Sequence, residues 1–147
     1  MSVHSYSRVW LHLTWATLER RPLLFKGAAA KLSGFLSEYA AEKGIYMKIN
    51  YVNPDHGHTL IDLLTHLCSE DVMQLLQGGS SHWINERNLL PGKFGWGRGY
   101  GAFSVSQSGV AKVAKYIADQ EPPHRKKSFG EKLKFLVERY ELRWQAD

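Results

Sequence analysis

Two histidines with one glycine between them are the first residues whose spacing could do chemistry. His56 and His58 follow a turn at 53–55, and residues 58–63 are apolar enough to predict a strand. Alternate side chains of a strand point to the same face, and the strand rise places the two Cα atoms about 7 Å apart. The two imidazoles can therefore converge on one metal ion. Two surface histidines beside a turn would show the same spacing, so this motif alone does not decide the function.

A tyrosine and a glutamine at helical spacing form the second candidate group. Tyr116 and Gln120 lie four residues apart in a segment, 109–120, that is predicted to be a helix and to end before a proline pair. Residues four apart share a helix face. At about 100° per residue, Tyr116 lies at the edge of the apolar stripe, where its hydroxyl can face outward. A half-buried aromatic residue at a helix border would look the same. The stripe consists of Val110, Val113, Ala114 and Ile117.

The charge of the chain favours a polyanionic partner. The formal net charge is +5, and the sequence pI is about 9.4. A basic surface attracts polyanions through phosphate contacts and counterion release. A merely solvated surface would give the same composition. Charge therefore permits nucleic-acid binding without establishing it.

Length and cysteine content narrow the class of protein. The 147 residues predict a single domain, 1–147, and 44% hydrophobic residues are enough for a packed core. One cysteine, Cys68, excludes an internal disulfide framework and a multi-cysteine zinc site. The composition fits a reducing cytoplasm. There is neither a secretory signal nor an apolar run of about 18 residues, so no membrane association is expected.

The elements that must position these residues follow a recognisable order. Residues 9–17 alternate in a way that predicts a strand buried on both faces. The whole pattern is β-α-β-β-α-β followed by helices, which is typical of an α+β, ferredoxin-like split βαβ fold. It implies a four-stranded antiparallel sheet with helices on one face, and such folds host many functions. The predicted strands are 9–17, 45–52, 58–63 and 94–105; the predicted helices are 28–43, 69–84, 109–120 and 128–144, the last within a basic helical tail, 124–144.

Six short blocks complete a pattern that spans nearly the whole chain. Their order and spacing along the chain identify a family more strongly than any single block does. The blocks are His12-Leu13-Thr14-Trp15 with Glu19-Arg20-Arg21-Pro22-Leu23-Leu24, then Asp55-His56-Gly57-His58, Ser80-Ser81-x-Trp83-Ile84-Asn85, Trp96-Gly97-Arg98-Gly99-Tyr100 with Val105-Ser106, Tyr116-Ile117-x-x-Gln120, and His124-Arg125-Lys126-Lys127-Ser128-Phe129.

These blocks resemble the single-tyrosine HUH transposases of bacterial insertion sequences, of the insertion sequence 200/605 type, including relatives associated with repetitive extragenic palindromes. The resemblance implies that Tyr116 attacks a DNA phosphate, keeps the 5′ phosphate as a phosphotyrosine and releases a 3′-OH. It implies that His56, His58 and Gln120 hold a divalent metal, Mg²⁺ or Mn²⁺, although histidines by ligand type also suit zinc. No small-molecule cofactor and no ATP are needed, because the covalent intermediate stores the bond energy.

The resemblance also implies partners. Single-stranded DNA with hairpin ends is the expected substrate, and a homodimer that exchanges its tyrosine helices is the expected active form. Aromatic and basic side chains together suit single-stranded nucleic acid. The candidate DNA contacts are Trp96, Arg98, Tyr100, Lys112, Arg125, Lys126 and Lys127.

One position departs from the family pattern. Gly57 stands where the family usually has a bulky apolar residue. Glycine loosens a strand, and we expect it to leave nothing packed behind the site.

Three alternatives stay open. The run Arg98-Gly99-Tyr100-Gly101 matches the start of the RNP1 motif of RNA-binding modules, which share the βαββαβ order. Ala102 then stands where an aromatic residue is needed, and the run falls on the fourth strand instead of the third. A metallohydrolase would use the histidines with a water nucleophile and would not need Tyr116. An inactive relative would bind hairpin DNA without cutting it.

Overall fold

A four-stranded sheet is the frame that positions the candidate site. The computed structural model describes residues 5–120 and 127–144. Within these residues the strands run antiparallel in the order β2-β3-β1-β4. The predicted α+β, ferredoxin-like split βαβ pattern is confirmed. In chain order the elements are β1 (Trp10–Ala16), α1 (Lys26–Glu42), β2 (Tyr46–Val52), β3 (His56–Asp62), α2 (Ser69–Glu86), β4 (Gly101–Val105), α3 (Val110–Ala118) and α4 (Phe129–Arg139), with 3-10 turns at Leu18–Arg20 and Gln107–Gly109.

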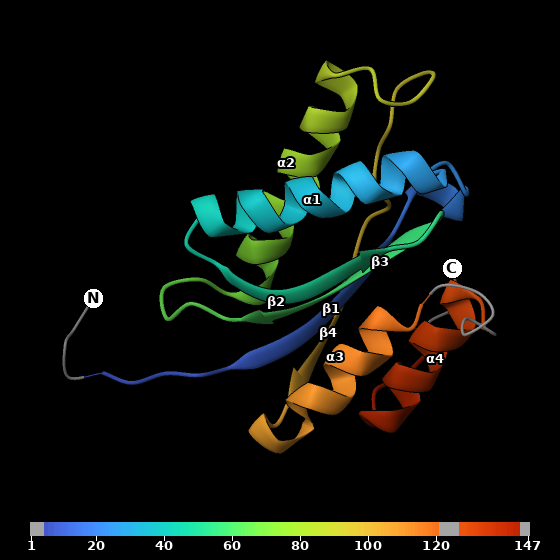
Figure 1. Cartoon of the computed structure of the whole chain (residues 1–147). Helices are drawn as coiled ribbons and strands as arrows, with labels where there is room; N and C mark the ends of the chain where they lie inside the picture. Colours follow the sequence, from blue (N-terminus) through green and yellow to red (C-terminus); the bar gives the residue numbers. More distant parts are fainter. Residues whose placement is uncertain (1–4, 121–126, 145–147) are drawn as a thin grey trace.

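Helices cover both faces of this sheet. α1 and α2 lie on one face, and α3 and α4 lie on the other (Figure 1). On β1, Leu13 and Trp15 belong to the core beneath α1 and α2. Trp10 of the same strand packs with Val110 and Ile117 of α3. Both faces of β1 are thus buried, as its alternation predicts, and the second pair of helices covers a face that the split βαβ unit itself leaves bare.

The strand register gathers polar side chains on the face covered by α3 and α4. Between β1 and β3, Thr14 pairs with His58 and His12 pairs with Leu60. β3 begins at His56, two residues before the predicted start, so both candidate histidines belong to the strand. Because alternate residues share a face, the register brings three histidines to one side of the sheet.

The predicted fourth strand is shorter in the structure. β4 covers Gly101–Val105 instead of 94–105, and in residues 94–100 the pairing is reduced to a single bridge between Trp96 and Thr17, just after β1. The indole of Trp96 turns inward, where its Nε1 donates to Ser80 Oγ at 2.8 Å. Gly99 then adopts a left-handed conformation, with φ 82°, which glycine tolerates without strain. The core contact and the turn thus interrupt the continuous pairing that was predicted for this segment.

The two C-terminal helices also end earlier than predicted. α3 ends at Ala118, so Gln120 lies just beyond the helix. α4 ends at Arg139 instead of 144. Directly after it, the Tyr140 hydroxyl donates to Ser104 O at 2.6 Å. This bond ties the end of α4 to the edge strand β4.

Part of the predicted basic tail lies outside the described residues. His124, Arg125 and Lys126 are in this group. Lys127 is described and exposed, and its ammonium lies 4.9 Å from the ring centroid of Phe135. In the described part of the chain, no helix is both long and apolar enough to cross a membrane.

Candidate active site

Two buried imidazoles form the centre of the candidate site. His56 and His58 are 0% and 1% exposed. Their ring centroids lie 4.9 Å apart, and the ring planes meet at 80°. The two-residue spacing on β3 brings the rings together beneath α3 and α4, in the interior of the protein and away from the turn surface.

The neighbours of His56 determine which of its nitrogens carries the proton. Its Nδ1 lies 2.7 Å from Asp55 Oδ1. A carboxylate only accepts hydrogen bonds, so Nδ1 donates and Nε2 presents its lone pair. Nε2 lies 3.1 Å from Asn53 Nδ2 and 3.2 Å from Lys132 Nζ. A carboxylate behind one ring nitrogen is the usual arrangement that orients a metal-binding histidine.

His58 is held by another histidine. Its Nδ1 lies 3.0 Å from Nε2 of His12. Burial lowers the pKa of His58 well below 6.5, and the neighbouring His56, His12 and Lys132 lower it further. Burial also lowers the pKa of His12 to about 4. Both rings are therefore neutral at physiological pH, and one donates to the other.

The second nitrogen of His58 stands out. Among the described residues, His58 Nε2 is buried and has no hydrogen-bond partner. Buried polar atoms are nearly always satisfied. If His58 donates through Nδ1 to His12, Nε2 carries a lone pair, and a divalent metal would be a suitable partner for it.

Tyr116 lies beside these histidines and remains accessible. Its ring centroid is 5.9 Å from that of His58 and 6.0 Å from that of His12. The residue is 41% exposed. Partial burial raises the pKa of its phenol, and the side chain of Gln120 opposes that rise. The hydroxyl is therefore protonated at neutral pH and must lose its proton during any attack.

Gln120 joins the same cluster from beyond the end of α3. It is 2% exposed, and its Nε2 donates to the backbone oxygen of Tyr116 at 2.9 Å. That bond leaves Oε1 to accept from another donor. Oε1 accepts a hydrogen bond from Lys132 Nζ. The structure thus brings together all four residues predicted for catalysis and metal binding.

Sequence reasoning gave no role to Lys132 or Asp55, and it left open whether His12 lines the site or only packs. Lys132 was one charge among many on an amphipathic helix, yet it is only 6% exposed. One feature of the sequence could have indicated that Lys132 is buried. It follows the apolar Phe129 by three residues, so both lie on one face of α4. The Phe129 ring centroid lies 4.9 Å from that of His56.

The donor set suits a divalent transition metal. It offers two imidazole nitrogens and one amide oxygen. In the part of the chain described, no three His, Cys, Asp or Glu side chains are grouped to hold a metal, and the oxygen of Gln120 is the predicted third protein ligand. Imidazoles suit zinc, copper, iron and nickel, whereas magnesium and manganese prefer oxygen, which the Gln120 amide would supply. The orphaned Nε2 of His58 and this donor chemistry fit a bound metal.

The expectation that nothing packs behind Gly57 is wrong. Gly57 pairs with Trp15 on the neighbouring strand. A Cβ atom on Gly57 would lie 3.2 Å from the Trp15 ring, which is 1% exposed. The indole therefore fills the space that a bulky residue at this position would take, and β3 is packed against a side chain behind the histidines.

A groove between α3 and α4 exposes Tyr116 to a substrate. It has a volume of about 420 Å³ and reaches from His12 and Tyr116 to Lys112 and Arg139. The two basic side chains place positive charge beside the tyrosine. Sequence reasoning had predicted Lys112 for DNA contact and had not singled out Arg139.

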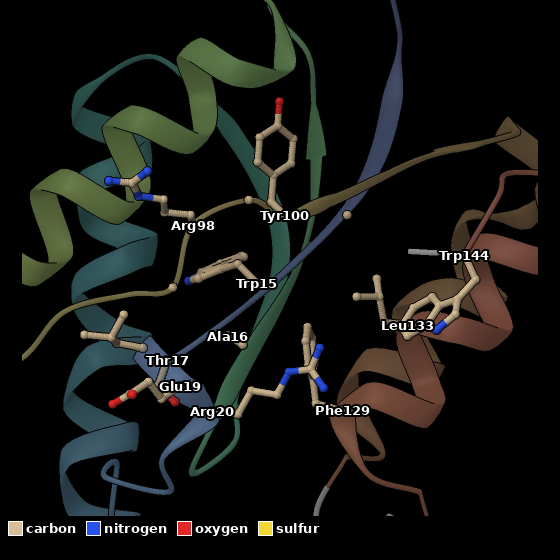
Figure 2. Close-up of a pocket in the computed structure, with 14 residues that line it drawn as sticks. Trp15, Ala16, Thr17, Glu19, Arg20, Arg98, Tyr100, Phe129, Leu133 and Trp144 are labelled. Carbon is tan, nitrogen blue, oxygen red and sulfur yellow. The ribbon is translucent and has the colours of Figure 1, made fainter. Parts of the chain in front are cut away.

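A second cavity contains two of the other predicted DNA contacts. It measures about 380 Å³ and lies between the end of β1, the 97–101 segment and α4. Arg98 and Tyr100 line it, together with Arg20, which lies 5.3 Å from the ring centroid of Phe129 (Figure 2). Trp96 does not line this cavity, because its indole is held by the core contact described above.

Fold and site together define a class of protein. The structure has a ferredoxin-like sheet with paired histidines on one strand, and these face a tyrosine on a covering helix. This arrangement agrees with the resemblance of the sequence blocks to single-tyrosine HUH transposases. The sequence profile of the family described as "Transposase IS200 like" matches residues 5–120. The chain belongs to this family.

Individual relatives agree with this assignment. The ISDra2 transposase TnpA of Deinococcus radiodurans is 28% identical over 114 residues, which cover 74% of this chain and 81% of the relative. A crystallised protein of Deinococcus radiodurans described as a transposase has 24% identity and a TM-score of 0.64, over 82% of this chain and 97% of its own. A REP-associated tyrosine transposase bound to a REP hairpin has 13% identity and a TM-score of 0.57, over 80% of this chain and 70% of its own. These two structures share the fold.

Proposed function

We propose that this transposase cuts and rejoins hairpin-bearing single-stranded DNA through a covalent 5′-phosphotyrosine at Tyr116. The observation that carries the proposal is the position of this accessible tyrosine, 5.9 Å between ring centroids from His58. The Nε2 of that histidine has no partner among the described residues. A nucleophile beside a prepared metal ligand suits phosphoryl transfer better than simple binding.

The reaction is a substitution at phosphorus. The Tyr116 hydroxyl oxygen forms a bond to the scissile phosphorus, the bond from phosphorus to the 3′ oxygen breaks, and the 3′ oxygen leaves as a hydroxyl. The phenolic proton passes to solvent, which reaches this 41% exposed residue. Attack by a 3′-OH on the phosphotyrosine reverses the step and rejoins DNA without ATP.

His56, His58 and Gln120 would hold the metal. A divalent ion there, Mg²⁺ or Mn²⁺, supplies polarisation of the phosphate and stabilises the charge that develops on it. Asp55 orients His56, and His12 keeps the lone pair of His58 directed inward. Lys112 and Arg139 line the groove beside Tyr116, where they would neutralise the flanking phosphates.

Hairpin-bearing single-stranded DNA is the proposed substrate. A net charge of +5 supports a nucleic-acid partner. A protein of similar fold, the REP-associated tyrosine transposase, has a solved structure bound to a REP hairpin. A non-catalytic RNA-binding module would not account for the buried histidine pair. The proposal places the protein in the cytoplasm with its substrate, which cell fractionation would test.

A homodimer is the proposed active form. The peptide that would allow the tyrosine helices to exchange, 121–126, lies outside the described residues. Two inactive variants, Tyr116→Phe and His56→Ala, can be mixed after partial unfolding. Recovered cleavage would show that the tyrosine of one chain serves the histidines of the other. A strictly monomeric protein that still cleaves DNA would overturn this part of the proposal.

The decisive experiment is a denaturing gel of protein mixed with labelled hairpin DNA and Mn²⁺. The wild type should give a labelled band at protein size, and Tyr116→Phe, His56→Ala and chelator should abolish it. Tyr46→Phe is the matched control, because Tyr46 is 52% exposed on β2 and remote from the groove. Cleavage that persists in Tyr116→Phe would favour the metallohydrolase. Folded, metal-binding protein that never cuts would favour an inactive relative.

A further inference from the structure

Lys132 is a buried cation at the centre of the candidate metal site. Only 6% of the residue is exposed. Burying an ammonium is costly unless hydrogen bonds replace its water. Its Nζ lies 3.2 Å from His56 Nε2 and donates to Gln120 Oε1. The two acceptors are the atoms through which these residues would bind a metal.

The local structure of α4 directs this side chain inward. Ser128 caps the helix through a reciprocal pair of hydrogen bonds with Glu131. Phe129 is 5% exposed and packs against His56. Because residues three apart share a helix face, Lys132 follows Phe129 into the site. Its position is thus set by the helix start and by core packing.

The ammonium and a metal compete for the same lone pair. A neutral imidazole has one acceptor nitrogen, so His56 Nε2 cannot accept a hydrogen bond from Lys132 and coordinate a metal at once. The amide of Asn53 also approaches this atom, at 3.1 Å, but it carries no full charge. A divalent ion placed beside the ammonium would in addition meet a like charge.

We propose that Lys132 is an internal cation that is hydrogen-bonded to two of the three proposed metal ligands, His56 and Gln120, and that it opposes metal binding until a divalent ion displaces it. This inference rests on the proposed function, because it needs the metal site formed by His56, His58 and Gln120. A purely structural Lys132, or one that acts only on the DNA phosphate, would not lower metal affinity.

Calorimetric titration of Mn²⁺ into DNA-free protein tests the proposal. Lys132→Met keeps most of the side-chain volume and removes the charge, so we expect Mn²⁺ to bind about tenfold or more tightly, the equivalent of one lost charged hydrogen bond. Lys134→Met is the matched control, an exposed lysine on the same helix, and it should bind as the wild type does. The gain should vanish when His58→Ala is added to Lys132→Met.

The outcomes separate the two proposals. Equal or weaker Mn²⁺ binding by a folded Lys132→Met protein, while His58→Ala still abolishes binding, would overturn the role of Lys132 and leave the metal site intact. No Mn²⁺ binding by either wild type or Lys132→Met would overturn both.

A second measurement needs no variant. Mn²⁺ should speed the amide hydrogen exchange of α4 in the wild type, because it breaks the contact between Lys132 and the sheet. Slower or unchanged exchange in α4 at saturating Mn²⁺ would contradict the displacement.

Discussion

The contact between Gly57 and Trp15 makes a sharp prediction about the residue that departs from the family pattern. Gly57→Val would restore a bulky apolar side chain on β3. A Cβ at this position lies 3.2, 3.4 and 3.5 Å from three atoms of the Trp15 ring. Two further methyl groups have to go deeper into a site where Trp15 is already fully packed.

The magnitude follows from two opposing effects. Overpacking a close-packed core costs about 1–3 kcal/mol, and replacing a strand glycine regains about 0.5–1 kcal/mol. The Trp15 ring cannot yield easily, because the Trp96 ring stands against it with centroids 5.8 Å apart. Overpacking therefore prevails, and we expect Gly57→Val to lower the free energy of unfolding by about 1–2 kcal/mol.

Urea denaturation followed by circular dichroism measures this change. Gly57→Ala, which adds only the Cβ, should be close to neutral. Trp15→Leu should make room, so that Gly57→Val costs less in that background, with a coupling of about 0.5–3 kcal/mol. A Gly57→Val protein at least as stable as the wild type, or strict additivity with Trp15→Leu, would refute the reasoning.

Three further predictions concern the site and its groove. Asp55→Asn should weaken Mn²⁺ binding about 10–100-fold, since it removes the carboxylate that orients His56; unchanged affinity in a calorimetric titration would contradict this. In metal-free buffer, as the pH falls from 6.5 to about 4, the folded pKa of His12, His12 alone should lower the free energy of unfolding by about 1.4 kcal/mol per pH unit. The unfolded chain takes up a proton there and the folded chain does not, and His58, whose pKa burial also lowers, should add to this loss. Urea curves at pH 7 and pH 5 measure this loss, which should be smaller in His12→Gln. A wild-type free energy of unfolding that does not change between these pH values would argue against a buried neutral ring. Lys112→Ala should weaken single-stranded DNA binding and reduce the slope of log affinity against log salt concentration by about 0.7. Lys48→Ala, at an exposed position on β2, should change neither. Equal effects of the two variants in fluorescence anisotropy would show that DNA does not bind along the groove.

Local spacing alone predicted much of the site. Two histidines two residues apart on a strand share a face. A tyrosine and a glutamine four residues apart share a helix face, but Gln120 lies just beyond the end of α3 and joins the site through its bond to the backbone of Tyr116. Neither relation depends on how the elements pack. The order of apolar patterns likewise predicted the chain order of strands and helices, because periodicity is a property of each segment.

The first residue of the fourth strand depends on tertiary contacts, which the local sequence pattern does not reveal. Residues 94–100 are rich in glycine and aromatic residues, which is compatible with a bent strand. The hydrogen bond from Trp96 to Ser80 fixes the segment against α2, and a single bridge to Thr17 is the pairing that Trp96 keeps. Ser80 belongs to α2, so only the packing of that helix decides where β4 begins.

The charge inside the site was decided by tertiary structure in the same way. In the sequence, Lys132 is one of many basic residues on an amphipathic helix. It becomes a neighbour of His56, at 3.2 Å, only because α4 packs on the face of the sheet where β3 carries its histidines. His12 reaches His58 through the register of β1 and β3. Spacing along the chain determines which side chains of one helix or strand share a face. Burial of apolar surface determines which helices and strands pack together, and the charges that surround the histidines depend on that packing.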